Sequence, residues 1–350
     1  MSIFISIASY RDDELARTVW SLYENADNPQ DLVFGIVNQQ ARGRFDDFSW
    51  LGDQVRLDNV HYRESQGAGW ARKRATSLYD GEDFFFQVDS HMLFAQGWDT
   101  DLIDMYNWCV KDAGTDKVIL SQYVAPYEIF TDGTTNFPED DEDFWDEPSW
   151  TSVVYTFYGA WAGNRERMQD FSVPHKSHTV LGALLFSRGQ IALDIPYDER
   201  ISFMGEELCY AIRAYTRGYE IYAPNKMVAW HFYKRPDRPK VWGDKKLAWF
   251  DIEKFSKDTQ KSVLLGEDNG VYGIGDYQRY LDYQKMIGID FSEFYGVERE
   301  PIQDINFVSE ELNFDFEPAL MSGPCLTDKH EYCSVDVCVC DCHKEISNVR

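Results

Sequence analysis

The chain has 350 residues and carries 60 Asp and Glu against 34 Lys and Arg, a formal net charge of −26. This acidic balance disfavours general nucleic-acid binding and attraction to anionic membrane surfaces, because both present repelling phosphate groups. With 44% hydrophobic and 16% aromatic residues, the chain can bury a sizeable core, which disfavours wholesale disorder.

The N-terminal region lacks the charged, apolar and cleavable parts of a signal peptide, because the strand-like residues 3–7 come almost at once. No run of about 18 apolar residues could span a membrane. We therefore expect a cytoplasmic protein without membrane insertion, whose seven cysteines are reduced or metal-bound.

Strand-like and helix-like segments alternate through residues 1–125. Short apolar runs predict strands at 3–8, 32–37, 84–88 and 118–124. Between them, helices are expected from Asp12 and Asp13, as capping residues, to about 25, and again over 69–79. This alternation predicts an α/β fold with a mostly parallel central sheet flanked by helices.

The second half is organised differently. Strands are expected at 152–158, 179–186 and 226–233, and a helix at 206–217 that Gly218 stops. Helical patterns return over 241–295, and five cysteines lie in the last thirty residues. We predict a catalytic domain at 1–240, a helical extension packed on it at 241–320, and a Cys/His-rich tail at 321–350.

The sharpest motif is Asp89-Ser90-His91, which ends the apolar run 84–88. Ligands of open α/β sheets bind at the carboxyl ends of strands, and an extended D-x-H places both side chains on one side of the backbone. Asp and His together can hold a divalent ion such as Mn²⁺. The alternative is a strand end that merely turns polar.

A second histidine, His231, ends another strand-like run between Trp230 and Phe232. Such a residue is more often part of a core than a metal ligand. The metal interpretation gains weight because Asp89 and His91 alone leave an ion short of protein ligands.

Two further motifs combine glycine with charge. Glu206 and Glu207 follow Gly205 at an expected helix start, where they would bind sugar hydroxyls or serve only as first-turn acids. Arg72 and Arg74 follow a glycine-containing turn, where they would pair with phosphates or form a solvated face. No P-loop or dinucleotide fingerprint occurs.

In this order, the motifs resemble the cytoplasmic-type polypeptide N-acetylglucosaminyltransferases, which glycosylate hydroxyproline, and more distantly the polypeptide N-acetylgalactosaminyltransferases. The resemblance covers roughly residues 2–233. It is carried by residues 5–12, 69–72, 87–92, 178–183 with 195–198, and 205–207 with 230–231.

The resemblance implies a GT-A glycosyltransferase fold, a UDP-sugar donor with N-acetylglucosamine as the sugar, Mn²⁺ or Mg²⁺, and retention of anomeric configuration by front-face displacement. It implies that the metal ligands are Asp89, His91 and His231. The donor-binding residues would be Ser9, Arg11, Gly69, Arg72 and Asp89, and the catalytic residues Glu206 and Glu207. The acceptor would be a hydroxyl on a protein or glycan, with hydroxyproline as one candidate.

The tail could form a zinc site, because thiolates and imidazoles suit tetrahedral Zn²⁺. The candidate ligands are Cys325, His330, Cys333, Cys338, Cys340, Cys342 and His343. A reduced tail or disulfides are the alternatives. For the whole chain, the alternatives are a metal-dependent nucleotide-sugar hydrolase and a non-catalytic sugar-binding or interaction protein.

Overall fold

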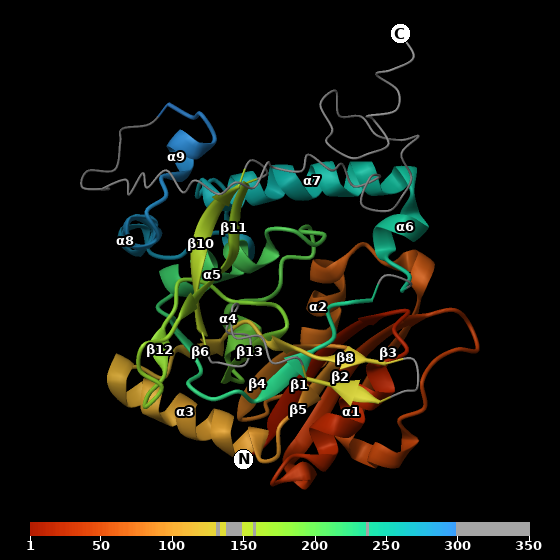
Figure 1. Cartoon of the computed structure of the whole chain (residues 1–350). Helices are drawn as coiled ribbons and strands as arrows, with labels where there is room; N and C mark the ends of the chain where they lie inside the picture. Colours follow the sequence, from red (N-terminus) through yellow and green to blue (C-terminus); the bar gives the residue numbers. More distant parts are fainter. Residues whose placement is uncertain (131–133, 138–148, 157–158, 236–237, 299–350) are drawn as a thin grey trace, which may run out of the picture.

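The computed structural model describes residues 1–130, 134–137, 149–156, 159–235 and 238–298. Its largest element is an eight-stranded sheet (Figure 1). In spatial order the strands are β12 (His175–Lys176), β14 (Glu220–Ala223), β6 (Val118–Ser121), β13 (Leu184–Arg188), β4 (Phe84–Asp89), β1 (Ile3–Tyr10), β2 (Leu32–Gln40) and β3 (Val55–His61).

The sheet is mixed rather than uniformly parallel. β4, β1, β2 and β3 run parallel to one another, as the alternation of strands and helices predicts. β13 lies antiparallel between β4 and β6, and β12 is antiparallel to β14. The parallel half therefore comes from the first part of the chain, whereas the later strands add the antiparallel pairs.

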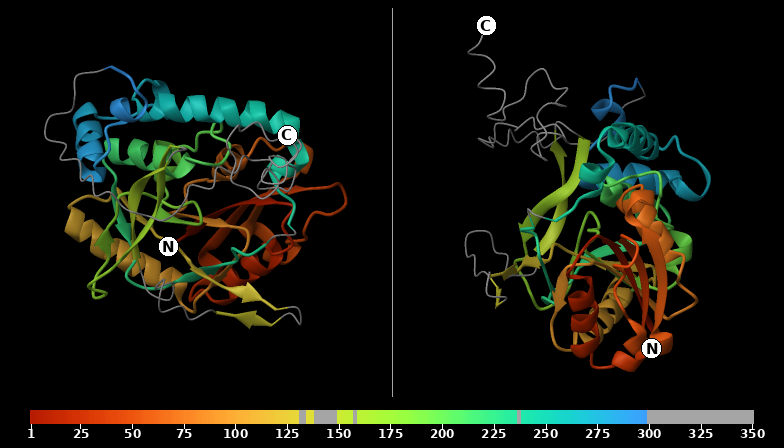
Figure 2. Two further views of the ribbon diagram at one scale, coloured as in Figure 1. Left: turned by 45° about the horizontal axis from the view of Figure 1, so that its top comes forward. Right: turned by 90° about the vertical axis from the view of Figure 1, so that its right-hand side faces the viewer.

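Helices cover both faces of the sheet (Figures 1 and 2). The helices are α1 (Leu15–Glu24), α2 (Ala68–Thr76), α3 (Trp98–Ala113), α4 (Ile191–Asp194), α5 (Glu206–Thr216), α6 (Val241–Lys245), α7 (Leu247–Leu264), α8 (Tyr277–Ile287) and α9 (Phe291–Phe294). Apolar residues of α1 and α3 belong to one core cluster, and residues of α5, α7 and α8 belong to a second. The C-terminal helices thus share a core with α5.

Alternate side chains of β4 point to opposite faces of the sheet and contribute to both core clusters. Phe84 and Phe86 belong to the cluster with α1 and α3, whereas Phe85 belongs to the cluster with α5. Phe86 is fully buried and stacks on Trp98 with ring centroids 5.2 Å apart. Truncating such a side chain to alanine lowers the free energy of unfolding by about 3–5 kcal/mol. The packing of β4 therefore fixes the position of the residues at its end.

A small three-stranded sheet begins directly after β4 in sequence. It consists of β5 (Met92–Phe94), β15 (Ala229–His231) and β7 (Ala125–Pro126). β15 is antiparallel to β5 and pairs His231 with Met92. This pairing brings two segments about 140 residues apart in sequence to the same place.

Two antiparallel ribbons complete the described strands. They are β8 (Glu128–Ile129) with β9 (Thr135–Asn136), and β10 (Ser149–Thr156) with β11 (Gly159–Arg167). Within the described residues, no helix is both long enough and apolar enough to cross a membrane.

Most elements predicted from sequence are present, with ends shifted by a few residues. The capping prediction for α1 is wrong: Glu14 occupies the N-cap, and no side chain caps the helix. The strand predicted at 179–186 begins only at Leu184. β3 and α3 were not among the expected elements; β3 reads as polar, and glycines at both ends delimit α3. The predicted boundary at 240 stays a prediction.

Candidate active site

A cavity of about 500 Å³ lies at the carboxyl ends of β1 and β4. Its wall includes the β4 end, the start of α2, the start of α5 and the segment after β15. The charged residues that line it are Asp12, Arg72, Asp89, Glu206, Glu207, Arg235, Arg238 and Lys240. The cavity therefore lies where open α/β sheets bind ligands.

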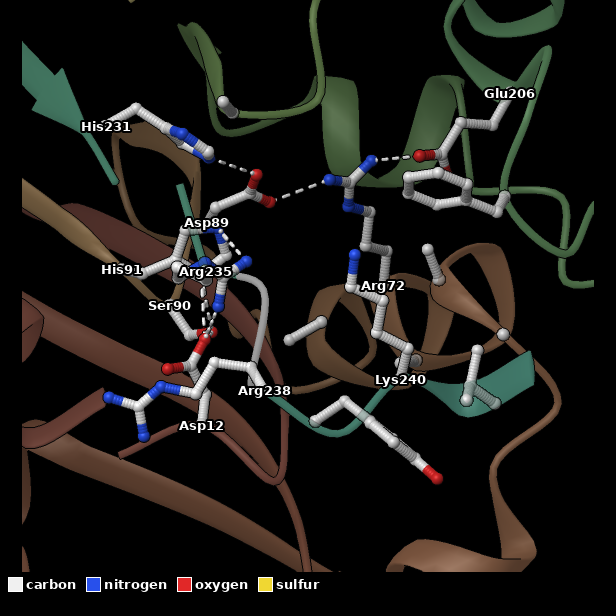
Figure 3. Close-up of a pocket in the computed structure, with 18 of the residues that line it drawn as sticks. Asp12, Arg72, Asp89, Ser90, His91, Glu206, His231, Arg235, Arg238 and Lys240 are labelled. Atoms are coloured by element: carbon white, nitrogen blue, oxygen red, sulfur yellow. Dashed lines mark hydrogen bonds and ion pairs between the residues drawn. The ribbon is translucent and has the colours of Figure 1, made fainter. Parts of the chain in front are cut away.

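Three candidate metal ligands meet on one side of this cavity. One ligand atom from each of Asp89, His91 and His231 lies within 4.8 Å of the other two. His231 Nε2 is 3.2 Å from Asp89 Oδ2, and the two imidazole rings are 4.5 Å apart. Figure 3 shows these side chains converging from β4, the turn after it and β15.

The geometry of this cluster fits a divalent ion. Two ligands at right angles on an ion with bonds of about 2.1 Å lie about 3 Å apart, close to the His231–Asp89 separation. His231 Nδ1 is buried and accepts no hydrogen bond within the described residues. One carboxylate and two imidazoles suit Mn²⁺ or a similar ion.

Asp12 supports His91 from behind. Its Oδ2 lies 2.8 Å from His91 Nδ1 and accepts from Ser90 Oγ at 2.9 Å. Asp12 is only 3% exposed; its Oδ2 contacts His91 and Ser90, whereas its Oδ1 accepts from the amide of Glu14, the N-cap residue of α1, at 3.1 Å. A carboxylate that holds a ligating histidine fixes its tautomer and ring orientation.

Arg72 connects the two acidic groups of the cavity. Its guanidinium donates to Asp89 Oδ1 at 2.9 Å and to Glu206 Oε1 at 2.5 Å (Figure 3). A third contact joins it to Tyr197 Oη at 3.2 Å. Arg72 is thus a buried bridge between the candidate metal ligands and the start of α5, and both terminal nitrogens of its guanidinium already donate hydrogen bonds.

Gly182 makes room for this bridge. A Cβ at Gly182 would lie 2.2 Å from Arg72 Nη1. The Gly182 amide donates to Glu207 Oε1 at 2.7 Å, and its carbonyl accepts from Gln87 Nε2 at 2.9 Å. The segment 178–183 of the family resemblance is therefore joined to the site through the backbone of Gly182.

The two glutamates at the start of α5 are buried. Burial raises the pKa of Glu206 to about 8, with the charges of Glu207 and Asp89 adding to the effect and Arg72 opposing it. Burial likewise raises the pKa of Glu207 to about 7 against its hydrogen bond from Gly182. The pair therefore favours holding a proton, which gives it donor as well as acceptor capacity toward sugar hydroxyls.

The acidic residues near the candidate metal ligands have lowered rather than raised pKa values. Burial opposes the charge of Asp89, but His231 and Arg72 hold the pKa of this carboxyl well below its usual range. His91 and Arg235 likewise overcome burial and lower the pKa of Asp12 to about 2. Burial lowers the pKa of His231 to about 4, so its imidazole is neutral and able to ligate near neutral pH.

Three predicted donor-binding residues do not line the cavity among the described residues. Ser9 is fully buried, and its carbonyl accepts from Gln39 Nε2 at 2.9 Å. Arg11 pairs with Asp244 of α6 at 2.7 Å. Gly69 packs on a loop, where a Cβ would meet Ile201 O at 2.1 Å. Their contacts to a donor stay predictions.

The possible zinc ligands lie outside the described residues, as does the rest of the tail from 299 onward. Zn²⁺ binding there stays a prediction.

Several cavity residues were missed from sequence. Gln39 lines the cavity, and its Oε1 is buried without a hydrogen-bond partner in the described part of the chain. Arg235, Arg238 and Lys240 come from one basic stretch after His231. Such a stretch close after a candidate metal ligand, in a chain this acidic, is the signal that could have identified them.

Comparison with solved structures supports the fold. The structure of GalNAc-T7 with UDP, GalNAc and Mn²⁺ aligns at a TM-score of 0.55 and 12% identity, over 85% of this chain and 59% of that chain. This chain therefore spans about three fifths of the GalNAc-T7 chain, and the likeness confirms the GT-A fold.

Two structures of S. aureus TarS also align, with lower scores. TarS itself gives a TM-score of 0.45 at 13% identity, over 82% of this chain and 43% of that chain. TarS 1–349 with UDP-GlcNAc gives 0.46 at 12% identity, over 82% of this chain and 71% of that chain.

Comparison by sequence gives the family. No curated protein matches this chain. The model of the family described as glycosyltransferase (GlcNAc) matches residues 2–49 and 44–297, and the chain belongs to that family.

Proposed function

We propose that this protein is a retaining glycosyltransferase that moves N-acetylglucosamine from UDP-N-acetylglucosamine to a hydroxyl on a protein or glycan. The observation that carries the proposal is one cavity of a GT-A fold that joins the Asp89–His91–His231 cluster to Glu206 through Arg72. The family name and the UDP and Mn²⁺ bound to GalNAc-T7 support the donor and metal.

The metal cluster would bind the diphosphate end of the donor. A divalent ion held by Asp89, His91 and His231 would offset charge on the diphosphate leaving group. Asp12 keeps His91 in the orientation that such binding needs. Arg235 lines the same part of the cavity and could pair with phosphate oxygens through its planar fork.

The base end of the donor would lie toward β2. Gln39 lines the cavity at the end of this strand, and its Oε1 is the buried acceptor without a partner among the described residues. Uracil presents a donor at N3, whereas cytosine presents an acceptor there. An amide oxygen at this place therefore favours a uridine nucleotide.

The sugar would lie against the start of α5. Glu206 has one oxygen on Arg72, and its Oε2 is buried without a partner in the described residues. Glu207 is held by the Gly182 amide. We assign Glu206 to sugar hydroxyls and Glu207 to the positioning of this wall, because only Glu206 has an unpartnered buried oxygen.

Transfer with retention follows from the family resemblance, by front-face displacement in which the leaving diphosphate helps remove the acceptor proton. A hydroxyproline on a protein is the acceptor that the same resemblance suggests. Phe203, Met204 and Trp242 form an apolar part of the cavity wall that an acceptor would contact.

The test is a panel of UDP-, GDP- and CDP-sugars incubated with Mn²⁺ or with chelator, read as released nucleotide. Mn²⁺-dependent release of UDP from UDP-N-acetylglucosamine is expected, and peptides with hydroxyproline, serine or threonine then identify the acceptor. Release as fast without acceptor as with any acceptor would instead indicate a hydrolase. Binding of UDP without turnover of any donor would indicate a binding protein.

A further inference from the structure

The guanidinium of Arg235 lies against a ring nitrogen of His91. Arg235 Nη2 is 2.7 Å from His91 Nε2, and Nη1 donates to Asp12 Oδ2 at 2.6 Å. The same Asp12 oxygen lies 2.8 Å from His91 Nδ1. Arg235, His91 and Asp12 therefore form a closed triangle of polar contacts at the edge of the metal cluster (Figure 3).

This triangle fixes which nitrogen of His91 carries the proton. Asp12 accepts from the Arg235 guanidinium and from the Ser90 hydroxyl, so it acts as a charged acceptor, and His91 Nδ1 must donate to it. A guanidinium can only donate, so His91 Nε2 must accept from Arg235. Arg235 therefore donates its hydrogen bond to the lone pair of His91 Nε2.

An imidazole nitrogen has one lone pair in the ring plane, and it serves either a hydrogen bond or a metal bond. Because Nδ1 is engaged with Asp12, Nε2 is the nitrogen of His91 left for a metal ion. The hydrogen bond from Arg235 and a metal bond at His91 Nε2 therefore exclude each other. In addition, the positive charges of the guanidinium and the metal ion repel each other.

We propose that Arg235 and the divalent ion exchange at His91 Nε2, so that Arg235 is a positioning residue that the arriving ion displaces. This inference rests on the metal site of the proposed function. Arg235 keeps the tautomer and orientation that suit coordination, yet the ion must replace one charge-assisted hydrogen bond in order to bind.

Displacement gives Arg235 a second role. Nη1 can keep its contact with Asp12 while Nη2 turns into the cavity that Arg235 already lines. A guanidinium freed there can pair with a phosphate oxygen, which an arginine still held on His91 cannot. Ion binding would therefore prepare the cavity for the donor as well as supply a charge.

The test measures Mn²⁺ binding to the full chain without nucleotide, by calorimetry and by the electron paramagnetic resonance of free Mn²⁺. Arg235→Met is expected to bind Mn²⁺ about tenfold more tightly than wild type, because the competing hydrogen bond is gone. A variant that merely damaged the site would bind it more weakly.

Arg238→Met is the matched control. Arg238 belongs to the same segment and lines the same cavity, but it pairs with Asp13 and Glu14. Removing its charge is expected to change the Mn²⁺ affinity by less than about threefold. If Arg235→Met does not fold, Arg235→Gln makes the same comparison.

Three results would overturn the exchange. Unchanged or weaker Mn²⁺ binding by the Arg235 variants would show that no competition exists. An equal gain in Mn²⁺ affinity in Arg238→Met would show that removing any nearby positive charge has this effect, without competition for His91 Nε2. A wild-type chain that binds no Mn²⁺ would reject the proposed metal site itself, a failure distinct from the other two.

Discussion

Replacing Gly182 with alanine should disable the site through Arg72. The added Cβ would lie 2.2 Å from Arg72 Nη1 and 2.6 Å from its Cζ, so the guanidinium must move by roughly 1 Å. A flexible side chain could yield easily, but this one is buried and paired with Asp89 and Glu206. Disrupting buried pairs costs about 3–5 kcal/mol. We therefore expect kcat/KM for donor turnover to fall about 100- to 1,000-fold.

The assay is Mn²⁺-dependent UDP release, combined with a double-mutant cycle. If alanine acts by moving Arg72, then Gly182→Ala should add almost nothing to the defect of Arg72→Ala. Gly243→Ala is the control, because a Cβ there meets no atom within 4 Å. Wild-type kcat/KM in Gly182→Ala, or additive defects in the double variant, would refute the reasoning. Thermal unfolding separates a misplaced Arg72 from a misfolded chain.

Three further substitutions test other walls of the cavity. Asp12→Asn should weaken Mn²⁺ binding by about 10- to 100-fold in a calorimetric titration, because His91 loses its orienting carboxylate, whereas the exposed Asp13→Asn should not. Glu207→Gln should raise the thermal stability increasingly as pH rises from about 4.5 to about 7, while lowering turnover. Because the pKa of Glu207 is raised in the folded state, the folded protein binds more protons than the unfolded chain over this range. The free energy of unfolding of the wild type therefore falls as pH rises, whereas glutamine does not titrate. An equal gain at low and high pH would contradict this account. Gln39→Leu should weaken UDP binding and reduce its preference over CDP; an unchanged preference would remove Gln39 from base recognition.

The strands that sequence predicts best are the ones buried on both faces. β1 and β4 are apolar at successive positions, so they stand out as short runs between polar turns. β13 is apolar too, yet its antiparallel place between β4 and β6 depends on how the chain returns from the segment before it. Strand order of this kind is non-local and has no signal in a short window.

The convergence of Asp89, His91 and His231 was predictable because two of them are close in sequence and the family resemblance supplies the third. Asp12 was interpreted only as a helix cap. Its Oδ1 does accept from the Glu14 amide at the start of α1, but its Oδ2 contacts His91, 79 residues away. Arg72 looked like part of a solvated basic face, but it is only 7% exposed. In each case the local sequence allowed a common structural interpretation, whereas contacts with residues distant in sequence determine what the side chain does.

The charge of the cavity explains why an ion belongs in it. The whole chain carries 60 acidic against 34 basic residues, whereas the cavity is lined by four acidic and four basic side chains. All three arginines that line the cavity are already paired: Arg72 and Arg235 with acidic residues of the cavity, and Arg238 with Asp13 and Glu14 beside it. The three arginines of the wall are therefore engaged with carboxylates, so a donor with two negative charges would meet no unpaired arginine there within the described residues. A divalent cation on Asp89, His91 and His231 would add two positive charges to the cavity, as many as the negative charges of a nucleoside diphosphate sugar. If this is the role of the ion, the affinity for UDP should fall steeply when Mn²⁺ is removed, and a trivalent or monovalent cation should not replace it.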